Sequence, residues 1–319
     1  LPLLALAVAL AVHRGLGPLR ELSQRLAARA PQAVEPLLLP GAPAELQPLL
    51  AQDNASQKDV EWFEQFFTRK PSGSLSEWKE KFNDESQDAQ EQEDRAAQVR
   101  SKIKMGLITL THPREQEESK YELALEYFIS AKAQADTLNL KAEQVLAYLA
   151  MARVFEEAGN HAKSIELLSK AQTIDLKADN PLSLLILHEL GRVYTQADST
   201  GEARSTYTTL LRLSRDSKQE KREADALFYL GVISTRETKY DSALALHKES
   251  LKLKRTLQDK AGEVTSLNTI GDLYLQMKNE DRALANYVAA LEISRKLDYV
   301  VKEVVTPLGI AMVPQLKEQ

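Results

Sequence analysis

The sequence contains no cysteine, which excludes disulfide bonds, thiolate catalysis and cysteine-ligated zinc sites. Glycine and proline are also scarce, with 12 of each among 319 residues, and β-branched residues do not gather into strand-like runs. These absences favour an all-α fold. The net charge of −5 gives no electrostatic reason to bind nucleic acid, so we predict no nucleic-acid partner.

Long hydrophobic runs are missing as well, apart from residues 1–12. That run is shorter than the roughly 20 residues that a membrane-spanning helix needs. Two interpretations stay open: the end of a truncated transmembrane helix, or the core of a signal peptide. Because the first residue is Leu, we expect a fragment or a processed form. We predict a cytoplasmic location, with membrane attachment through residues 1–12 as the alternative.

Catalytic and metal-binding motifs are absent from the sequence. It has no Walker loop, no G-x-G-x-x-G, no H-E-x-x-H and no G-x-S-x-G. None of the five histidines is paired with another ligand three or four residues away in a way that suggests a metal site, and His247 has the position of a packing residue. The basic stretch 246–255 favours a solvated helix face, with a phosphate or acidic-partner site as the alternative. We therefore predict a protein that is not an enzyme and needs no cofactor or metal.

What the sequence does contain is a repeat with a period of about 40 residues. A small residue recurs at Ala152, Gly191, Gly231 and Gly271, and a second one follows each of them twelve residues later. Apolar residues surround both at spacings of three and four, which is typical of amphipathic helices. The pattern predicts antiparallel helix pairs, with small side chains letting adjoining pairs nest closely.

This pattern resembles the tetratricopeptide repeat (TPR), in which Leu-Gly, an aromatic residue, Ala, another aromatic residue and Ala stand at these offsets. The period exceeds the usual 34 or so residues, as it does in kinesin light chain. The resemblance implies a right-handed α-solenoid over residues 96–319. We expect regular repeats at 142–180, 181–221, 222–260 and 261–299, and a terminal helix at 300–319.

The N-terminal part differs in composition from the repeats. Residues 1–50 hold seven of the twelve prolines and no Lys, Asp or aromatic residue. Residues 13–50 resemble the HAMP linker of bacterial sensor histidine kinases, through Gly-Pro-Leu at 17–19 and Glu45 with Pro48-Leu49. That resemblance implies a homodimer through residues 18–50, whereas the alternative is a leader without a retained role.

Residues 51–95 are predicted to be a helical linker. Its aromatic residues, Trp62, Phe63, Phe66 and Phe67, are spaced to pack onto the first repeat, with a partner-binding patch as the alternative. Ser74 and Glu77 form a candidate capping box at the start of its second helix.

The TPR resemblance also implies a concave groove lined by the first helix of each repeat. The groove positions flank the Leu-Gly pair. Carried onto this chain, they are Leu149, Arg153, Glu156, His188, Arg192, Thr195, Phe228, Val232, Thr235, Asn268, Asp272 and Leu275. Only Arg153, Arg192 and Asn268 could serve a carboxylate clamp like that of chaperone-binding TPRs.

This mixture of charged, amide and apolar groups suits a peptide or partner segment held by its backbone and side chains. We therefore predict a non-catalytic protein-interaction scaffold. The alternative is the sensory part of a bacterial membrane-anchored signalling protein, such as a histidine kinase, without its catalytic domain.

Overall fold

The computed structural model describes residues 57–68, 74–111 and 118–296. The predicted HAMP-like linker, the candidate membrane segment at 1–12 and the predicted terminal helix at 300–319 lie outside these residues. Within the described residues the protein is entirely α-helical and has no strand, which confirms the predicted fold class. No helix among the described residues has the length and apolarity required to cross a bilayer.

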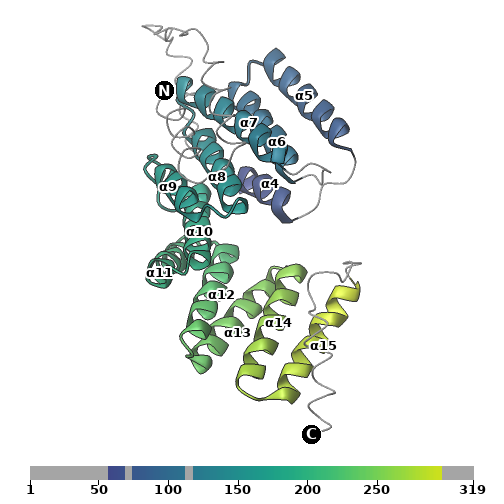
Figure 1. Ribbon diagram of the computed structural model, residues 1–319, viewed down its shortest axis with the longest axis vertical. Helices are drawn as coiled ribbons and strands as arrows, with labels where there is room; N and C mark the ends of the chain where they lie inside the picture. Colours follow the sequence, from purple (N-terminus) through teal and green to yellow (C-terminus); the bar gives the residue numbers. More distant parts are fainter. Residues whose placement is uncertain (1–56, 69–73, 112–117, 297–319) are drawn as a thin grey trace. The chain divides into compact units, whose positions relative to one another are not determined.

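The described helices fall into two compact units that divide between Leu176 and Lys177. The first unit contains α4 (Gln57–Thr68), α5 (Leu75–Glu91), α6 (Arg95–Thr111), α7 (Glu118–Thr137), α8 (Lys141–Glu157) and α9 (His161–Gln172). The second contains α10 (Pro181–Gln196), α11 (Thr200–Asp216), α12 (Glu220–Arg236), α13 (Tyr240–Thr256), α14 (Lys260–Gln276) and α15 (Glu280–Lys296). In the second unit, each helix packs against the next along the chain (Figure 1).

Several helices begin next to a residue whose side chain caps the first turn. At the start of α5, the Ser74 hydroxyl accepts from the Glu77 amide at 3.2 Å, and the Glu77 side chain accepts from the Ser74 amide at 3.1 Å, which confirms the capping box. The Asn180 side chain accepts from the Leu182 amide, and Pro181 follows as the first residue of α10. Proline is tolerated there because the first helical amides have no partner within the helix.

Most turns between the described helices share one backbone conformation, and the connection between α9 and α10 is the exception. Seven non-glycine residues in these turns have positive φ, among them Asp198, Lys218, Thr238, Gln258 and Lys278, which recur every 20 residues. In the part of the chain that the structure describes, only Gly159 supplies a glycine at such a position. In each case a left-handed residue ends one helix and reverses the chain direction.

The core of the second unit repeats one contact between a glycine and a ring. A Cβ atom at Gly191 would lie 2.6 Å from the Tyr207 ring, and Cβ atoms at Gly231 and Gly271 would meet His247 and Tyr287 at the same distance. Each ring lies on the second helix of the glycine's own pair. The prediction that these glycines mark contacts between adjoining pairs is therefore wrong: they bring the two helices of a single pair together.

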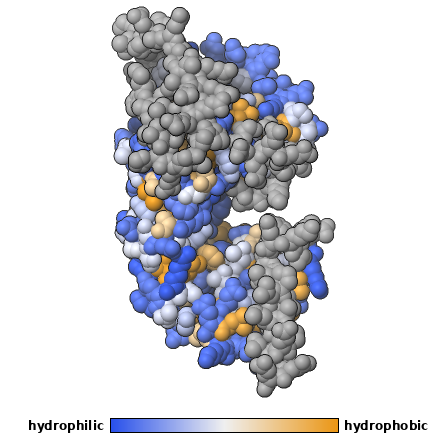
Figure 2. Space-filling model, viewed as in Figure 1, coloured by the Kyte–Doolittle hydropathy of each residue, from blue (hydrophilic) through white to orange (hydrophobic). Residues whose placement is uncertain are grey.

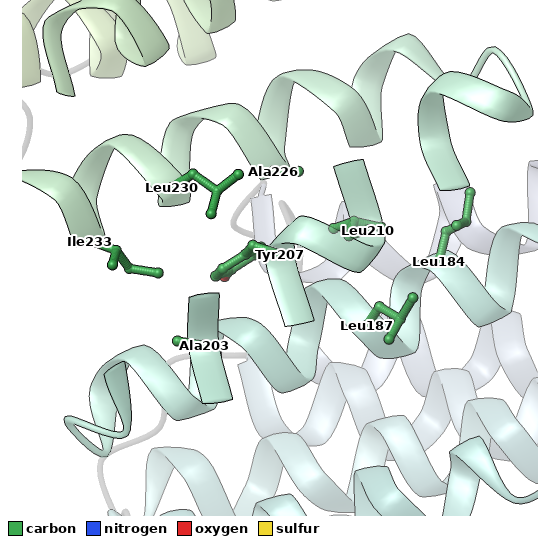
Figure 3. Close-up of a cluster of buried hydrophobic side chains, with 8 residues drawn as sticks. All are labelled: Leu184, Leu187, Ala203, Tyr207, Leu210, Ala226, Leu230 and Ile233. Atoms are coloured by element: carbon green, nitrogen blue, oxygen red, sulfur yellow. The ribbon is translucent and has the colours of Figure 1, made fainter. Parts of the chain in front are cut away.

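Tyr207 also joins neighbouring pairs, because it is fully buried among apolar residues of α10, α11 and α12 (Figure 3). The cluster consists of Leu184, Leu187, Ala203, Tyr207, Leu210, Ala226, Leu230 and Ile233. The isolated helix pair could not bury these side chains by itself, and stacking of successive pairs supplies the core.

The first unit packs an aromatic cluster in the same manner. Phe66 and Trp78 pack around Phe82, Met105 and Ile108, so α4 and α5 cover α6. This confirms that Phe66 packs onto the first repeat helix rather than forming a partner-binding patch. Gly106 of α6 meets the ring of Phe128 on α7, and it thus takes the place of the Leu-Gly glycine despite the longer connection.

Candidate functional site

The predicted groove residues lie on four helices that belong to two units. Leu149, Arg153 and Glu156 are on α8 of the first unit, and the other nine are on α10, α12 and α14 of the second. In the second unit α10 packs directly against α12, so their groove residues form neighbouring stripes. We describe these two stripes, together with that of α14, as the α10–α12–α14 face.

The arginines of the predicted groove are paired with carboxylates on their own helices. Arg153 bonds to Glu156 at 3.3 Å, and Arg192 bonds to Glu189 at 2.5 Å. On α12, Arg222 pairs with Asp225 at 3.4 Å. Since the guanidinium groups of Arg192 and Arg222 are neutralised locally, the α10–α12–α14 face does not present the array of uncommitted cations that a carboxylate clamp requires.

His188 belongs to a stack of rings at the junction of α10 and α12. Its ring lies 5.7 Å from that of Tyr229, which in turn stacks on Tyr207 at 4.8 Å and an interplanar angle of 4°. The Nδ1 atom of His188 is 4.0 Å from an Asp225 oxygen. Burial lowers the pKa of His188 even though Asp225 favours its charged form. The imidazole is therefore a neutral, polar group at neutral pH.

Phe228 is the central apolar residue of the α12 stripe, and it is half-buried. Its ring meets that of His247 at 5.3 Å, edge to face. On another side the Lys254 ammonium lies 4.3 Å from the ring centroid. The Phe228 ring thus contacts both the His247 ring and the Lys254 ammonium, which belongs to α13.

The α14 stripe is polar at its centre. Asp272 is exposed, and it accepts a hydrogen bond of 2.5 Å from the Tyr287 hydroxyl on α15. Burial and this bond raise the pKa of the Tyr287 hydroxyl, so it remains protonated. Asn268 and Leu275 on the same helix are half-buried, and Leu275 packs against the last apolar cluster.

Two predicted positions offer less surface than the others. Leu149 is 3% exposed and Thr195 is 6% exposed. Thr195 donates its hydroxyl to the Gly191 carbonyl at 2.7 Å, and Thr235 donates to that of Gly231 at 3.0 Å. Both threonines therefore satisfy their hydroxyl groups within their own helices. Val232 is half-buried, and it has the repeat position of Arg192.

Two residues of this face are not among the predicted positions. Asp225 stands three residues before Phe228, and it is the acidic group nearest to both His188 and Arg222. Lys254 belongs to the basic stretch 246–255 that the sequence predicts to be solvated, yet it is only 6% exposed. The 40-residue period is the sequence signal for the burial of Lys254. This residue has the repeat position of Ser214 and Ser294, which are both buried.

Among the described residues, no group of three or more His, Asp or Glu side chains is arranged to hold a metal ion. The face of the molecule seen in Figure 2 is largely hydrophilic over the described residues, with small and separate hydrophobic areas. The α10–α12–α14 face thus offers hydrogen bonds, an aromatic ring and one buried cation. These groups suit the binding of a chain segment.

Comparison with known proteins identifies the repeat. The tetratricopeptide repeat pattern matches residues 143–216 and 222–296. No curated protein sequence matches the chain.

Several solved structures share the fold. The crystal structure of BtubC from P. vanneervenii is 17% identical, with 71% of this chain and 93% of that chain covered at a TM-score of 0.60. The apo form of RapI is 14% identical, covering 91% and 96% at a TM-score of 0.52. A variant of a putative kinesin light chain from Podosopora anserina, with nearly identical TPR-like repeats, is 18% identical, covering 63% and 96% at a TM-score of 0.50. At these identities the likeness establishes the helical-repeat fold alone.

Proposed function

This chain is a tetratricopeptide-repeat protein across residues 143–216 and 222–296 and hence a protein-interaction scaffold, and we propose that it binds an extended peptide segment along the α10–α12–α14 face. The binding is non-catalytic. The observation that carries the proposal is the composition of this face: Phe228 and Val232 of α12 supply apolar side chains, and Asn268 and Asp272 of α14 supply hydrogen-bonding groups.

The neighbouring charges favour a segment of low charge over most of its length. Arg192 and Arg222 already have carboxylate partners, and the pKa of His188 is lowered by burial. A strongly acidic ligand would have to displace these pairs, at a cost in desolvation and lost hydrogen bonds. A segment with apolar side chains and a hydrogen-bonding backbone meets no such cost.

The test is selection from a random peptide library displayed on phage, followed by affinity measurement with synthetic peptides. We expect the full chain to select related peptides, and Val232→Arg to weaken their binding at least tenfold. Val288→Arg is the matched control, because Val288 is 43% exposed on α15, a helix that supplies no residue to this face. Circular dichroism would verify that both variants keep their helix content.

The proposal fails if the chain selects no peptide, or if both variants bind as the unmodified chain does. Crosslinks from a bound peptide only to α11 or α15 would also contradict it. The HAMP-like signalling alternative concerns residues outside the described ranges, and no contact of the described residues favours it.

A further inference from the structure

We propose that Lys254 is the receptor for one carboxylate group of the bound peptide, at the junction of α12 and α14. This inference rests on the proposed function, and it adds a specific chemical requirement to the ligand. It assigns a binding role to a side chain of α13, the second helix of its pair, whose ammonium group reaches the stripe formed by the first helices.

Lys254 is the exception among the buried charged residues of the described part of the chain. Five of the six have an ion pair: Lys132 with Asp136, Glu143 with Arg100, Lys163 with Glu166, Arg222 with Asp225, and Glu263 with both Arg255 and Lys260. For Lys254, no carboxylate of the described residues lies within ion-pair distance. A buried charge without a counter-ion is costly, and folds rarely retain one without a use for it.

The surroundings of the ammonium form a built site. Its Nζ atom donates to the Ser266 hydroxyl of α14 at 3.1 Å, and it lies 4.3 Å from the centroid of the Phe228 ring of α12. The side chain passes over Gly262, where a Cβ atom would lie 2.9 Å from the Lys254 Cδ atom. One repeat earlier, the position of Gly262 is held by Arg222. Because Gly262 has no side chain, the Lys254 side chain has room to pass between α13 and α14.

The two nearest carboxylates do not satisfy the ammonium. Asp225 and Asp259 both raise the pKa of Lys254, but desolvation is the larger effect and lowers it overall. Asp225 is paired with Arg222, and Asp259 accepts from the Gly262 amide at 2.9 Å as the cap of α14. An arriving carboxylate would accept from the ammonium, which has three N–H donors and gives one of them to the buried Ser266 hydroxyl.

The fold itself does not require a charge at this position. The equivalent residues of the preceding and following pairs are Ser214 and Ser294, which are buried without any charge. The Ser214 hydroxyl donates to the Leu211 carbonyl and that of Ser294 to the Ala290 carbonyl, so both stay within their own helices. A lysine that served packing alone could thus be replaced by a neutral side chain without loss.

The experiment compares Lys254→Met with Lys252→Met, which removes an exposed lysine two residues away on the same helix. The probes are peptides selected by the unmodified chain, each made with Glu or Asp and with the corresponding Gln or Asn. Each peptide is also made with a free and an amidated C-terminus, because a terminal carboxylate offers the same chemistry as a side chain.

We expect the chain to prefer one acidic group, either at a fixed side-chain position or at the C-terminus, by about 10- to 100-fold, the range for a charged hydrogen bond. Lys254→Met should abolish this preference and leave the affinity for the neutral peptides unchanged. Lys252→Met should retain the preference. Without peptide, Lys254→Met should melt at the same temperature as the unmodified chain or higher, since a desolvated charge is removed.

The inference is overturned if Lys254→Met keeps the acidic preference, or if the unmodified chain does not distinguish acidic from neutral peptides. In those cases Val232→Arg would still weaken binding at least tenfold, and the proposed groove function would stand. Selection of no peptide at all would overturn both proposals together.

Discussion

At the scale of single residues, His247 stands where the neighbouring pairs have a tyrosine. Tyr207 and Tyr287 each cover the glycine of their own pair, and His247 covers Gly231 in the same way. The structure confirms the packing role predicted for this histidine. Both ring nitrogens of His247 are buried without a hydrogen-bond partner. Burial, and then the charge of Lys254, lower its pKa to about 4.

This histidine should make the second unit sensitive to acid. In the unfolded chain the pKa of His247 is near 6.5, and in the folded chain it is about 4. The unfolded state therefore binds a proton first, so stability is complete above about pH 6.5 and declines as the pH falls towards 4. Between pH 7.5 and pH 5 the loss from this group should be about 2 kcal/mol.

His247→Tyr provides the test, because the adjacent pairs show that a tyrosine fits against a glycine in this position. We expect the variant to lose less stability than the unmodified chain between pH 7.5 and pH 5, as measured by urea denaturation at both values. The buried His188 is present in both chains and cancels in the comparison. Equal losses in the two chains would show that His247 does not carry the acid sensitivity.

At the scale of the helix and its turn, backbone strain recurs at the non-glycine turn residues that have positive φ. Thr238, between α12 and α13, has a φ of 60°. A left-handed backbone costs a β-branched residue about 1–2 kcal/mol, whereas glycine adopts it freely but loses more entropy on folding. Thr238→Gly should therefore stabilise the protein by roughly 0.5–1 kcal/mol, measured by chemical denaturation.

Gly159→Ala is the opposite change at the matching turn between α8 and α9, where φ is 72°. No atom lies within 4 Å of the added Cβ, so only backbone strain is introduced. It should destabilise by about 1 kcal/mol. If Thr238→Gly were neutral or destabilising while Gly159→Ala behaved as expected, packing of the Thr238 side chain would have to outweigh its backbone strain.

The helices and the turns differ in how well the sequence predicts them. Helix pairs follow from the 40-residue period, because small and apolar residues at helical spacing leave few other ways to bury that surface. The left-handed turns carry little signal, since Asp198, Lys218 and Thr238 share no residue type. The burial of Lys254 escapes prediction because periodicity distinguishes faces poorly for a long side chain that enters the core from a helix end.

The groove positions come from the TPR pattern. The pattern predicts the helix and the helix face of a residue, but it does not predict the hydrogen-bond partners of its side chain. The pattern places Arg192 on a first helix of a pair, but its pairing with Glu189 depends on side-chain conformations that no pattern contains. Likewise, Thr195 has a groove position yet turns its hydroxyl to the Gly191 carbonyl. Their roles in binding stay predictions.

At the scale of the whole molecule, a stack of repeats distributes stability differently from a single globular core. Each pair in the second unit contacts mainly its neighbours along the chain. Stability is then close to a sum of local terms, and damage to one pair spreads chiefly to adjacent pairs. The two compact units provide a setting in which this locality can be measured.

Gly231→Val is the change that tests locality. A Cβ atom at this position would lie 2.6 Å from the buried His247 ring, so the substitution must push α12 and α13 apart. Overpacking of this kind typically costs about 1–3 kcal/mol. Hydrogen exchange followed by mass spectrometry should show faster exchange in α12 and α13, a smaller increase in α11 and α14, and no change in α6 and α7 of the first unit.

Gly201→Ala is the control for that experiment, because Gly201 lies in α11 with no atom within 4 Å of an added Cβ. It should leave exchange unchanged or slow it slightly, since alanine favours a helix over glycine by about 0.5–1 kcal/mol. A uniform increase across both units with Gly231→Val would mean that the chain unfolds as one cooperative body. Strain at one pair would then propagate through every helix, and the additive description of the repeats would have to be abandoned.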